Sequence, residues 1–365
     1  MKTNPIDRAD LDRGRATDPL VRASGLHHLV LETPDIDVAA RFWGDFGLSP
    51  SAKTSEALYL RSASSAHHVL KLVRGSRGRL ATLAFRVESD LDLRKLASLP
   101  EGSPVHRIDE PGGGARVSLA APGGLAIDAV HGIAELPPLE TRDPLPSNVT
   151  GGVTRSGRPV RVSAAPSEVL RLGHAAIETT RPAALLLWLM RTLGMIVSDY
   201  QHLDTERSPT PIVSFMRCDR GATLTDHHTL AVAIGPRPGL AHVAFEVRDV
   251  DEIGRGAAFL RARGYRHAWG IGRHILGSQL FDYWRAPDGI VAEHYSDGDV
   301  FDSSAPTGRL PFRGSTLAQW GEKPPPDFAL PPLSPSAIAG AVRGIATSDE
   351  ISVALLARAA SALSR

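Results

Sequence analysis

The 365-residue chain has little of what several classes of protein require. A single cysteine, Cys218, excludes an intrachain disulfide and a cysteine-based zinc site, and we interpret it as a small buried side chain. The longest apolar run, around residues 183–190, is far shorter than the ~20 residues of a membrane helix. The 41 basic and 40 acidic residues differ by one charge (41 − 40 = +1), so charge predicts neither a nucleic-acid nor a membrane partner.

The remaining composition is that of a globular protein rich in histidine. The N-terminal sequence mixes acids and bases and lacks the apolar region of a secretory signal, so we expect a soluble, cytoplasmic protein. Apolar residues make up 42% of the chain, enough for a sizeable core, and the length suggests two domains. Histidine occurs 14 times, several times next to another histidine.

Two halves of the chain repeat one sequence pattern. GLHHLVLETPDI, from Gly25, resembles RLGHAAIETTRP, from Arg171, and each segment is followed by a helical pattern that ends on a glycine. Three further blocks correspond in the same order: residues 66–73 with 226–233, 80–90 with 240–250, and 116–130 with 280–295. Self-similarity over so long a period predicts a duplicated fold, in which each half is a strand, a helix and about three more strands.

The composition divides the chain into five segments. Residues 1–24 show no clear period and are predicted to form a mobile arm, and residues 25–135 and 167–300 are the two halves, joined by a Pro/Gly/Ser-rich linker at 136–166. Residues 301–365 begin with stretches too rich in proline for regular structure and end in a helical region of two pieces. We interpret TSDE at 347–350 as a capping box for the second piece. These helices are expected to pack on the body, with a lid over a site as the alternative.

The second half carries a metal-binding pattern. Three of its residues lie at matching strand positions of the repeat: His174, His242 and Glu293. The first half has different residues at those positions: His28, Thr82 and Asp128. Alternation in HVAFEV places His242 on the face opposite to Val243 and Phe245, away from the packed side. Two histidines and one carboxylate form the facial triad of non-haem Fe(II) oxygenases. Each residue alone is more typical of a structural or solvated side chain, and their joint placement favours a metal site.

Longer blocks around these residues resemble a known family. LGHAAIET, DHHTLAV, LAHVAFEV, GRHILGSQLFDYW and APDGIVAEHYSDGD are similar to the catalytic module of type I extradiol ring-cleavage dioxygenases, of the vicinal oxygen chelate superfamily. The likeness spans about residues 167–299, with a decayed copy over 25–131. It implies an α+β fold of tandem βαβββ modules that form two similar cupped-sheet domains, of which the N-terminal one binds no metal, plus a C-terminal helical extension.

The resemblance also implies residue roles. The metal ligands would be His174, His242 and Glu293, holding Fe(II), with Mn(II) possible because it accepts the same ligands. His228 would be the acid/base, and His274 and Tyr283 would lie near the substrate hydroxyls. The decayed copy keeps the pair His67-His68, so the dipeptide alone does not indicate catalysis, and we assign no role to His27 or His67.

The implied reaction is the Fe(II)-dependent cleavage of a catecholic ring beside its diol, with O₂, to a muconic semialdehyde-type product. The partners would be a small catecholic substrate and O₂, without nucleic acid or membrane, and the protein would be a homo-oligomer, as is usual for such folds. Two alternatives stay open: a hydroxyphenylpyruvate dioxygenase-like enzyme, which shares the duplicated architecture and the triad, and a non-catalytic small-molecule binding module, which needs no triad.

Overall fold

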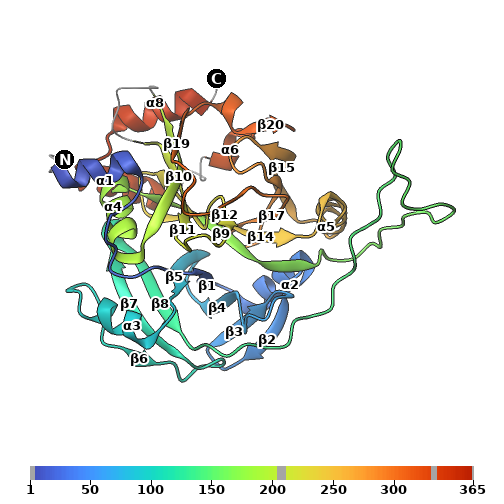
Figure 1. The fold of residues 1–365 in the computed structure, drawn as a ribbon, viewed down its shortest axis with the longest axis horizontal. Helices are drawn as coiled ribbons and strands as arrows, with labels where there is room; N and C mark the ends of the chain where they lie inside the picture. The colour runs from blue at the N-terminus through green and yellow to red at the C-terminus, as the bar shows by residue number, and fades with distance from the viewer. Residues whose placement is uncertain (1–4, 204–210, 330–334, 364–365) are drawn as a thin grey trace.

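Two large mixed sheets form the body of the protein (Figure 1). The structure is a computed structural model and describes residues 5–203, 211–329 and 335–363. The first sheet has the strand order β2-β3-β4-β1-β5-β8-β7-β6, and the second has the order β19-β10-β11-β13-β9-β14-β17-β16-β15-β20. Among the described residues, no helix is both long and apolar enough to cross a membrane.

The first half consists of two βαβββ modules. One contains β1 (Gly25–Thr33), α2 (Ile36–Phe46), β2 (Ser49–Lys53), β3 (Ala57–Arg61) and β4 (Leu70–Arg74). The other contains β5 (Arg79–Arg86), α3 (Asp90–Ala97), β6 (His106–Arg107), β7 (Ala115–Ala121), the short η1 (Pro122–Gly124) and β8 (Leu125–His131). Local sequence sets the ends of α2, because the Asp35 side chain accepts two backbone N–H bonds at its start and Gly47, at a φ of 120°, ends it.

The second half repeats this arrangement. Its first module contains β9 (Val169–Thr179), α4 (Pro182–Leu193), β10 (Met195–His202), β11 (Val213–Cys218) and β13 (Leu230–Ile234). Its second contains β14 (Gly239–Val247), α5 (Val250–Ala262), β15 (Arg266–His274), β16 (Leu280–Arg285) and β17 (Val291–Ser296). Two short strands, β12 (Thr225–Asp226) and β18 (Val300–Phe301), pair with each other. In both halves the first strands of the two modules pair antiparallel, β1 with β5 and β9 with β14. The predicted fold class and duplication are confirmed, but each half contains two βαβββ units, whereas the repeat alone indicated one strand, one helix and about three more strands.

The two halves share one apolar core. Helix α2 of the first half packs on the second sheet, where the Trp43 ring centre is 5.8 Å from that of Phe245 and Phe46 stacks on His294 at 3.7 Å. Cys218 is buried, as expected. The segment 136–166 between the halves contains no helix or named strand and extends away from the body in Figure 1. The two large sheets are therefore separate, but they are stabilised by one core that contains side chains from both halves.

The N-terminal segment packs on the second half, which corrects the expectation of a mobile arm. Helix α1 (Pro5–Arg13) lies beside α4, where Arg191 donates hydrogen bonds to Asp7 (2.8 Å) and Asp10 (2.7 and 2.9 Å). Further along, Val21 and Ala23 are buried. Charged residues of the segment that we expected to be a mobile arm form ion pairs with the body. Residues 1–4 of that prediction lie outside the described residues.

The proline-rich segment also forms strands, contrary to expectation. Strand β19 (Gly308–Pro311) joins one edge of the second sheet, parallel to β10, and β20 (Ala318–Trp320) joins the other edge beside β15. Proline is tolerated in β19 because it is the last residue of an edge strand, where a missing N–H breaks no ladder. The elements that complete the chain are η2 (Gly314–Thr316), α6 (Pro326–Ala329), α7 (Pro335–Ala346) and α8 (Val353–Leu363).

The predicted capping box at 347–350 is wrong. Helix α8 begins at Val353, and its first turn is capped by Ser352, whose hydroxyl accepts from the backbone N–H of Leu355 (3.2 Å). Glu350 instead accepts from the backbone N–H groups of Ala183 and Ala184, at 2.6 and 3.2 Å. These donors open α4, which has no side-chain cap of its own. A helix start needs acceptors for its free N–H groups. Glu350 therefore caps α4, which is distant in sequence, and does not cap the helix that follows it in the chain.

Candidate metal centre

Three neighbouring strands of the second sheet carry His174 (β9), His242 (β14) and Glu293 (β17). In the registers of β14, Ala244 lies opposite His174 on one side and opposite Glu293 on the other. His242 lies two residues earlier and so shares the face of Ala244. Because alanine carries only a methyl group, the three longer side chains can meet above it. The faces predicted for β14 are also observed, since Val243 and Phe245 are fully buried on its other side.

The three ligand atoms form a nearly equilateral triangle. Nε2 of His174 and Nε2 of His242 are 3.3 Å apart, and they lie 3.2 and 3.3 Å from Oε2 of Glu293. Two adjacent ligands of an octahedral ion, each about 2.1 Å from it, are about 3.0 Å apart. The triangle therefore has the size of one face of a coordination shell.

The chemistry of this triangle also fits a divalent metal ion. The Glu293 side chain is fully buried, and among the described residues its ion-pair neighbours are histidines only, with no lysine or arginine paired to it. A buried carboxylate without such a partner is costly, and a cation removes that cost. Burial raises the pKa of Glu293 and lowers the pKa of His174 and of His242 to about 3, so both imidazoles keep a lone pair for a metal.

His228 lies against the triad and is linked to the surface by two hydrogen bonds. Its ring centre is 4.1 Å from that of His174, and its Nδ1 is 3.0 Å from Nδ1 of His227. Nε2 of His227 is 2.7 Å from Oδ2 of Asp199, whose side chain is 13% exposed. His228 is predicted from the sequence, whereas His227 and Asp199 are found only in the structure.

This chain of contacts fixes the tautomers of the two imidazoles. The Asp199 carboxylate can only accept, so Nε2 of His227 carries the proton and donates. Nδ1 of a neutral His227 is then an acceptor, and Nδ1 of His228 must donate to it. Nε2 of His228 is left without a proton, which is the state that a general base requires.

A comparison of the two halves in the structure shows that Asp199 has no counterpart in the first half. The β2–β3 hairpin has the same register shift as the β10–β11 hairpin, and after it Ala52 pairs with Tyr59 where Asp199 pairs with Phe215. The first half thus keeps its histidine pair, with 3.1 Å between the Nδ1 atoms of His67 and His68, but has no carboxylate behind it. The carboxylate behind the histidine pair is therefore found only in the half that has the His/His/Glu triad.

His274 and Tyr283 form the other side of the site. His274 Nδ1 donates to the carbonyl oxygen of Leu317 (2.9 Å), so its Nε2 accepts from the Tyr283 hydroxyl (2.9 Å). Burial raises the pKa of Tyr283 well above its usual value, and its ring centre is 5.2 Å from that of His242. The C-terminal extension therefore contacts the site at two places: the Leu317 carbonyl, just before β20, binds His274, and the ring centre of Phe328 in α6 lies 5.0 Å from that of Tyr283. These contacts come from residues 317–328 rather than from the C-terminal helices named in the lid alternative.

The corresponding positions of the first half do not form a triad. His28 and Asp128 lie opposite Ala84 in the same registers, and Thr82 has the position of His242. Asp128 accepts a hydrogen bond from Ser118 (2.6 Å), so its carboxylate already has a partner. The expected decay is visible in the side chains, while the backbone arrangement is preserved.

Comparisons with known proteins agree with this geometry. A family model described as the Glyoxalase/Bleomycin resistance protein/Dioxygenase superfamily matches residues 171–293. Metapyrocatechase 2 of Cupriavidus necator is 30% identical over 331 residues, which cover 90% of this chain and 98% of that relative. An iron-dependent extradiol dioxygenase of Rhodococcus jostii (strain RHA1) is 24% identical over 166 residues, or 44% of this chain and 51% of the relative.

Solved structures establish the fold independently. Homoprotocatechuate 2,3-dioxygenase of Brevibacterium fuscum, in complex with 3,4-dihydroxyphenylacetate, superposes with a TM-score of 0.71 at 21% identity, covering 87% of this chain and 94% of that one. The Mn(II)-bound glyoxalase from Novosphingobium aromaticivorans superposes with a TM-score of 0.69 at 24% identity, covering 86% and 97%.

The paired βαβββ modules and the His/His/Glu triangle define a metal-dependent enzyme of the vicinal oxygen chelate type. The likeness to metapyrocatechase 2 extends over nearly the whole of both chains, and the chain belongs to the extradiol dioxygenases of this superfamily. The protein is therefore an oxidoreductase, and neither the hydroxyphenylpyruvate dioxygenase-like enzyme nor the non-catalytic binding module is favoured any longer.

Proposed function

We propose that this protein uses Fe(II), held by His174, His242 and Glu293, to open a catecholic ring beside its two hydroxyl groups with O₂. The observation that carries the proposal is the buried triangle of ligand atoms, whose carboxylate is paired with no lysine or arginine among the described residues. Three protein ligands on one face leave positions for both catechol oxygens and for O₂. When bound, the ion supplies Lewis acidity, which lowers the pKa of a catechol hydroxyl, and an electron path to O₂.

His228 is the proton carrier in this proposal. Its Nε2 is unprotonated because Asp199 and His227 fix the tautomers behind it. Nε2 takes the proton of a catechol hydroxyl and holds it near the ring until a later intermediate requires it. Burial and the neighbouring histidines His174 and His227 hold the pKa of His228 well below its usual value, so the imidazole is neutral before substrate binds and readily returns the proton that it takes up.

Tyr283 and His274 position the second catechol oxygen. The Leu317 carbonyl holds His274, which in turn holds the Tyr283 hydroxyl beside the triad. Tyr283 stays protonated because burial raises its pKa, so it remains a hydrogen-bond donor that can turn toward a catecholate oxygen. Its ring, with those of Trp269 and Phe328, forms an aromatic wall that excludes water from this side.

The test is reconstitution of the metal-free enzyme with Fe(II) without oxygen, followed by mono- and bicyclic catechols and O₂. We expect a yellow ring-fission product, and no colour from any catechol would contradict the proposal. Parallel reconstitution with Mn(II) decides between the two ions; the iron-dependent relative supports Fe(II).

We further propose that the protein is cytoplasmic and forms a homo-oligomer. Cell fractionation tests the location, and light scattering tests the oligomeric state.

A further inference from the structure

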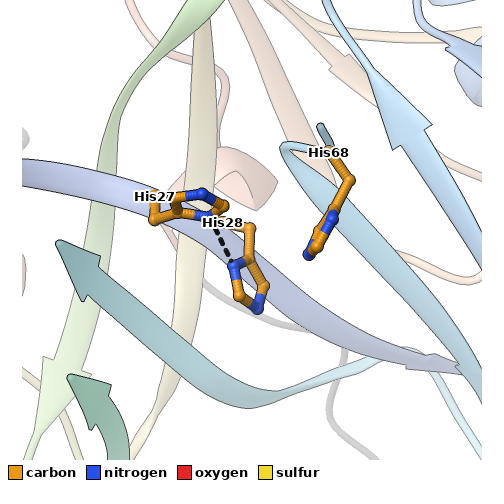
Figure 2. Close-up of side chains that lie close together, drawn as sticks. All are labelled: His27, His28 and His68. Carbon is orange, nitrogen blue, oxygen red and sulfur yellow. Dashed lines mark hydrogen bonds between the residues drawn. The ribbon is translucent and has the colours of Figure 1, made fainter. Parts of the chain in front are cut away.

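Three buried histidines of the first half meet beside the position of its lost triad. His27 and His28 lie on β1 and His68 lies in the loop before β4 (Figure 2), and their exposed fractions are 6%, 7% and 4%. Nδ1 of His27 and Nδ1 of His28 are 2.7 Å apart, and the ring centre of His68 is 4.5 Å from that of His28. One nitrogen of each ring lies within 4.8 Å of the others.

A pair of size changes relative to the second half makes room for this cluster. The position of His27 is occupied in the second half by Gly173, where an added Cβ would lie 2.1 Å from the Tyr295 hydroxyl. The position of Tyr295 is occupied in the first half by Val130. The smaller Val130 leaves space, and the imidazole of His27 fills it. The first half has thus gained a nitrogen ligand at a place where the working half has an aromatic ring.

The surroundings allow a metal ion to enter and to complete its shell. A cavity of about 20 Å³ borders His28 and His68, enough for one water molecule, which needs about 10–15 Å³. A larger cavity, of about 180 Å³, borders His27. The first has room for a water molecule as a fourth ligand, and the second would be the entry path of the ion.

The two cations near His28 are each matched by a carboxylate. Lys71 is ion-paired with Glu110 at 2.5 Å, and Arg116 lies 3.9 Å from Asp128. Arg86 is a third cation, which acts on His27 and lines the larger cavity. Burial and the neighbouring cationic groups lower the pKa of His27 and of His68 to about 3. The imidazoles are therefore neutral at physiological pH and offer lone pairs.

We propose that His27, His28 and His68 form a second metal site, which binds a divalent ion of the zinc class (Zn²⁺, Co²⁺ or Ni²⁺) with water as fourth ligand. Three imidazoles without a carboxylate suit these ions better than the harder Mn²⁺. Tetrahedral ligand atoms are about 3.3 Å apart, and the three candidate nitrogens lie within 4.8 Å of one another, so binding would draw them closer together. The ion would tie β1 to the loop before β4. This departs from the expectation of a metal-free first half and does not depend on the proposed function.

The test counts metal ions in full-length protein. Chelator-treated protein is titrated with Zn²⁺ and examined by native mass spectrometry, with Co²⁺ as a spectroscopic probe for four-coordinate nitrogen ligation. We expect two ions per chain in the wild type, one in His68→Gln, and one in a variant that carries His242→Ala and Glu293→Ala. The matched control is His106→Gln, because His106 on β6 is an exposed histidine of the same half and lies outside the cluster; it keeps two ions.

Each result decides the proposal separately from the function of the triad. A wild type that binds one Zn²⁺, together with a His242→Ala/Glu293→Ala variant that binds none, overturns it. An ion that remains bound when His68→Gln is added to that double variant also overturns it. Circular dichroism and dioxygenase activity of His68→Gln, expected at wild-type values, establish that the variant folds. Zn²⁺ should raise the melting temperature of the double variant, and this increase should vanish with His68→Gln.

Discussion

The hydrogen-bonded chain from Asp199 through His227 to His228 makes a specific prediction for Asp199→Asn. The carboxylate can only accept from His227, whereas an asparagine amide can also turn its NH₂ group toward Nε2. In that orientation the tautomers reverse: His227 donates through Nδ1, and Nε2 of His228 carries a proton. The base is then blocked, although no side chain at the metal has changed.

The size of the effect follows from the bond that is replaced. A hydrogen bond to a charged group contributes about 1.5–3 kcal/mol and one between neutral groups about 0.5–1.5 kcal/mol. The lost tautomer bias is therefore about 1–2 kcal/mol, and because 1.36 kcal/mol is tenfold in rate, kcat should fall about 5–30-fold. The KM should change little, because Asp199 lies two residues away along the chain of contacts and does not reach the substrate. Removal of the base itself in His228→Ala should cost more, about 10²–10⁴-fold.

The assay is steady-state ring cleavage by Fe(II)-loaded protein, with iron content and melting temperature measured for each variant. Asp219→Asn is the matched control, because Asp219 makes a surface ion pair with Arg22 (3.0 Å) and should keep wild-type kcat. His227→Gln should resemble Asp199→Asn, whereas His67→Gln at the equivalent position of the first half should have no effect on turnover. A folded, iron-loaded Asp199→Asn with wild-type kcat would refute the tautomer argument.

Three further predictions concern the ligand set and the stability of the second half. Glu293→Gln removes the anionic ligand, so iron content by elemental analysis should fall below about a tenth of the wild-type value; retained iron contradicts the assignment. Glu350→Gln weakens the cap of α4 by about 0.5–2 kcal/mol and should lower the melting temperature, whereas Asp349→Asn, at a side chain 52% exposed, should not. Burial raises the pKa of Glu178 to about 7, so the wild type loses stability as pH rises from about 4.3 through 7. Glu178→Gln lacks this loss, and its melting temperature relative to wild type should increase between pH 5 and 8; a constant difference would contradict the shift.

Much of the architecture could be predicted because the same sequence pattern occurs in both halves of the chain. The repeated strand and helix patterns in the two halves predicted the duplicated βαβββ arrangement, and helix ends such as Asp35 and Gly47 are set by neighbours in the sequence. Packing of the N-terminal segment could not be predicted in this way. Its charged residues show no periodic pattern, and only the folded chain brings Arg191 of α4 within hydrogen-bond distance of Asp7 and Asp10.

The same division holds for the metal centre. The sequence by itself indicated His174, His242 and Glu293 as candidate metal ligands, because alternation along a strand settles the face of His242 and the repeat aligns it with the other two, as the strand registers show. The tertiary structure alone decided what surrounds them: the Asp199 carboxylate behind His227, the Leu317 carbonyl on His274, and the ring of His27 in the space of Tyr295. Face and register follow from local backbone geometry, which neighbouring residues encode. Contacts between distant segments depend on how loops and side-chain volumes fit together, and no short stretch of sequence carries that information.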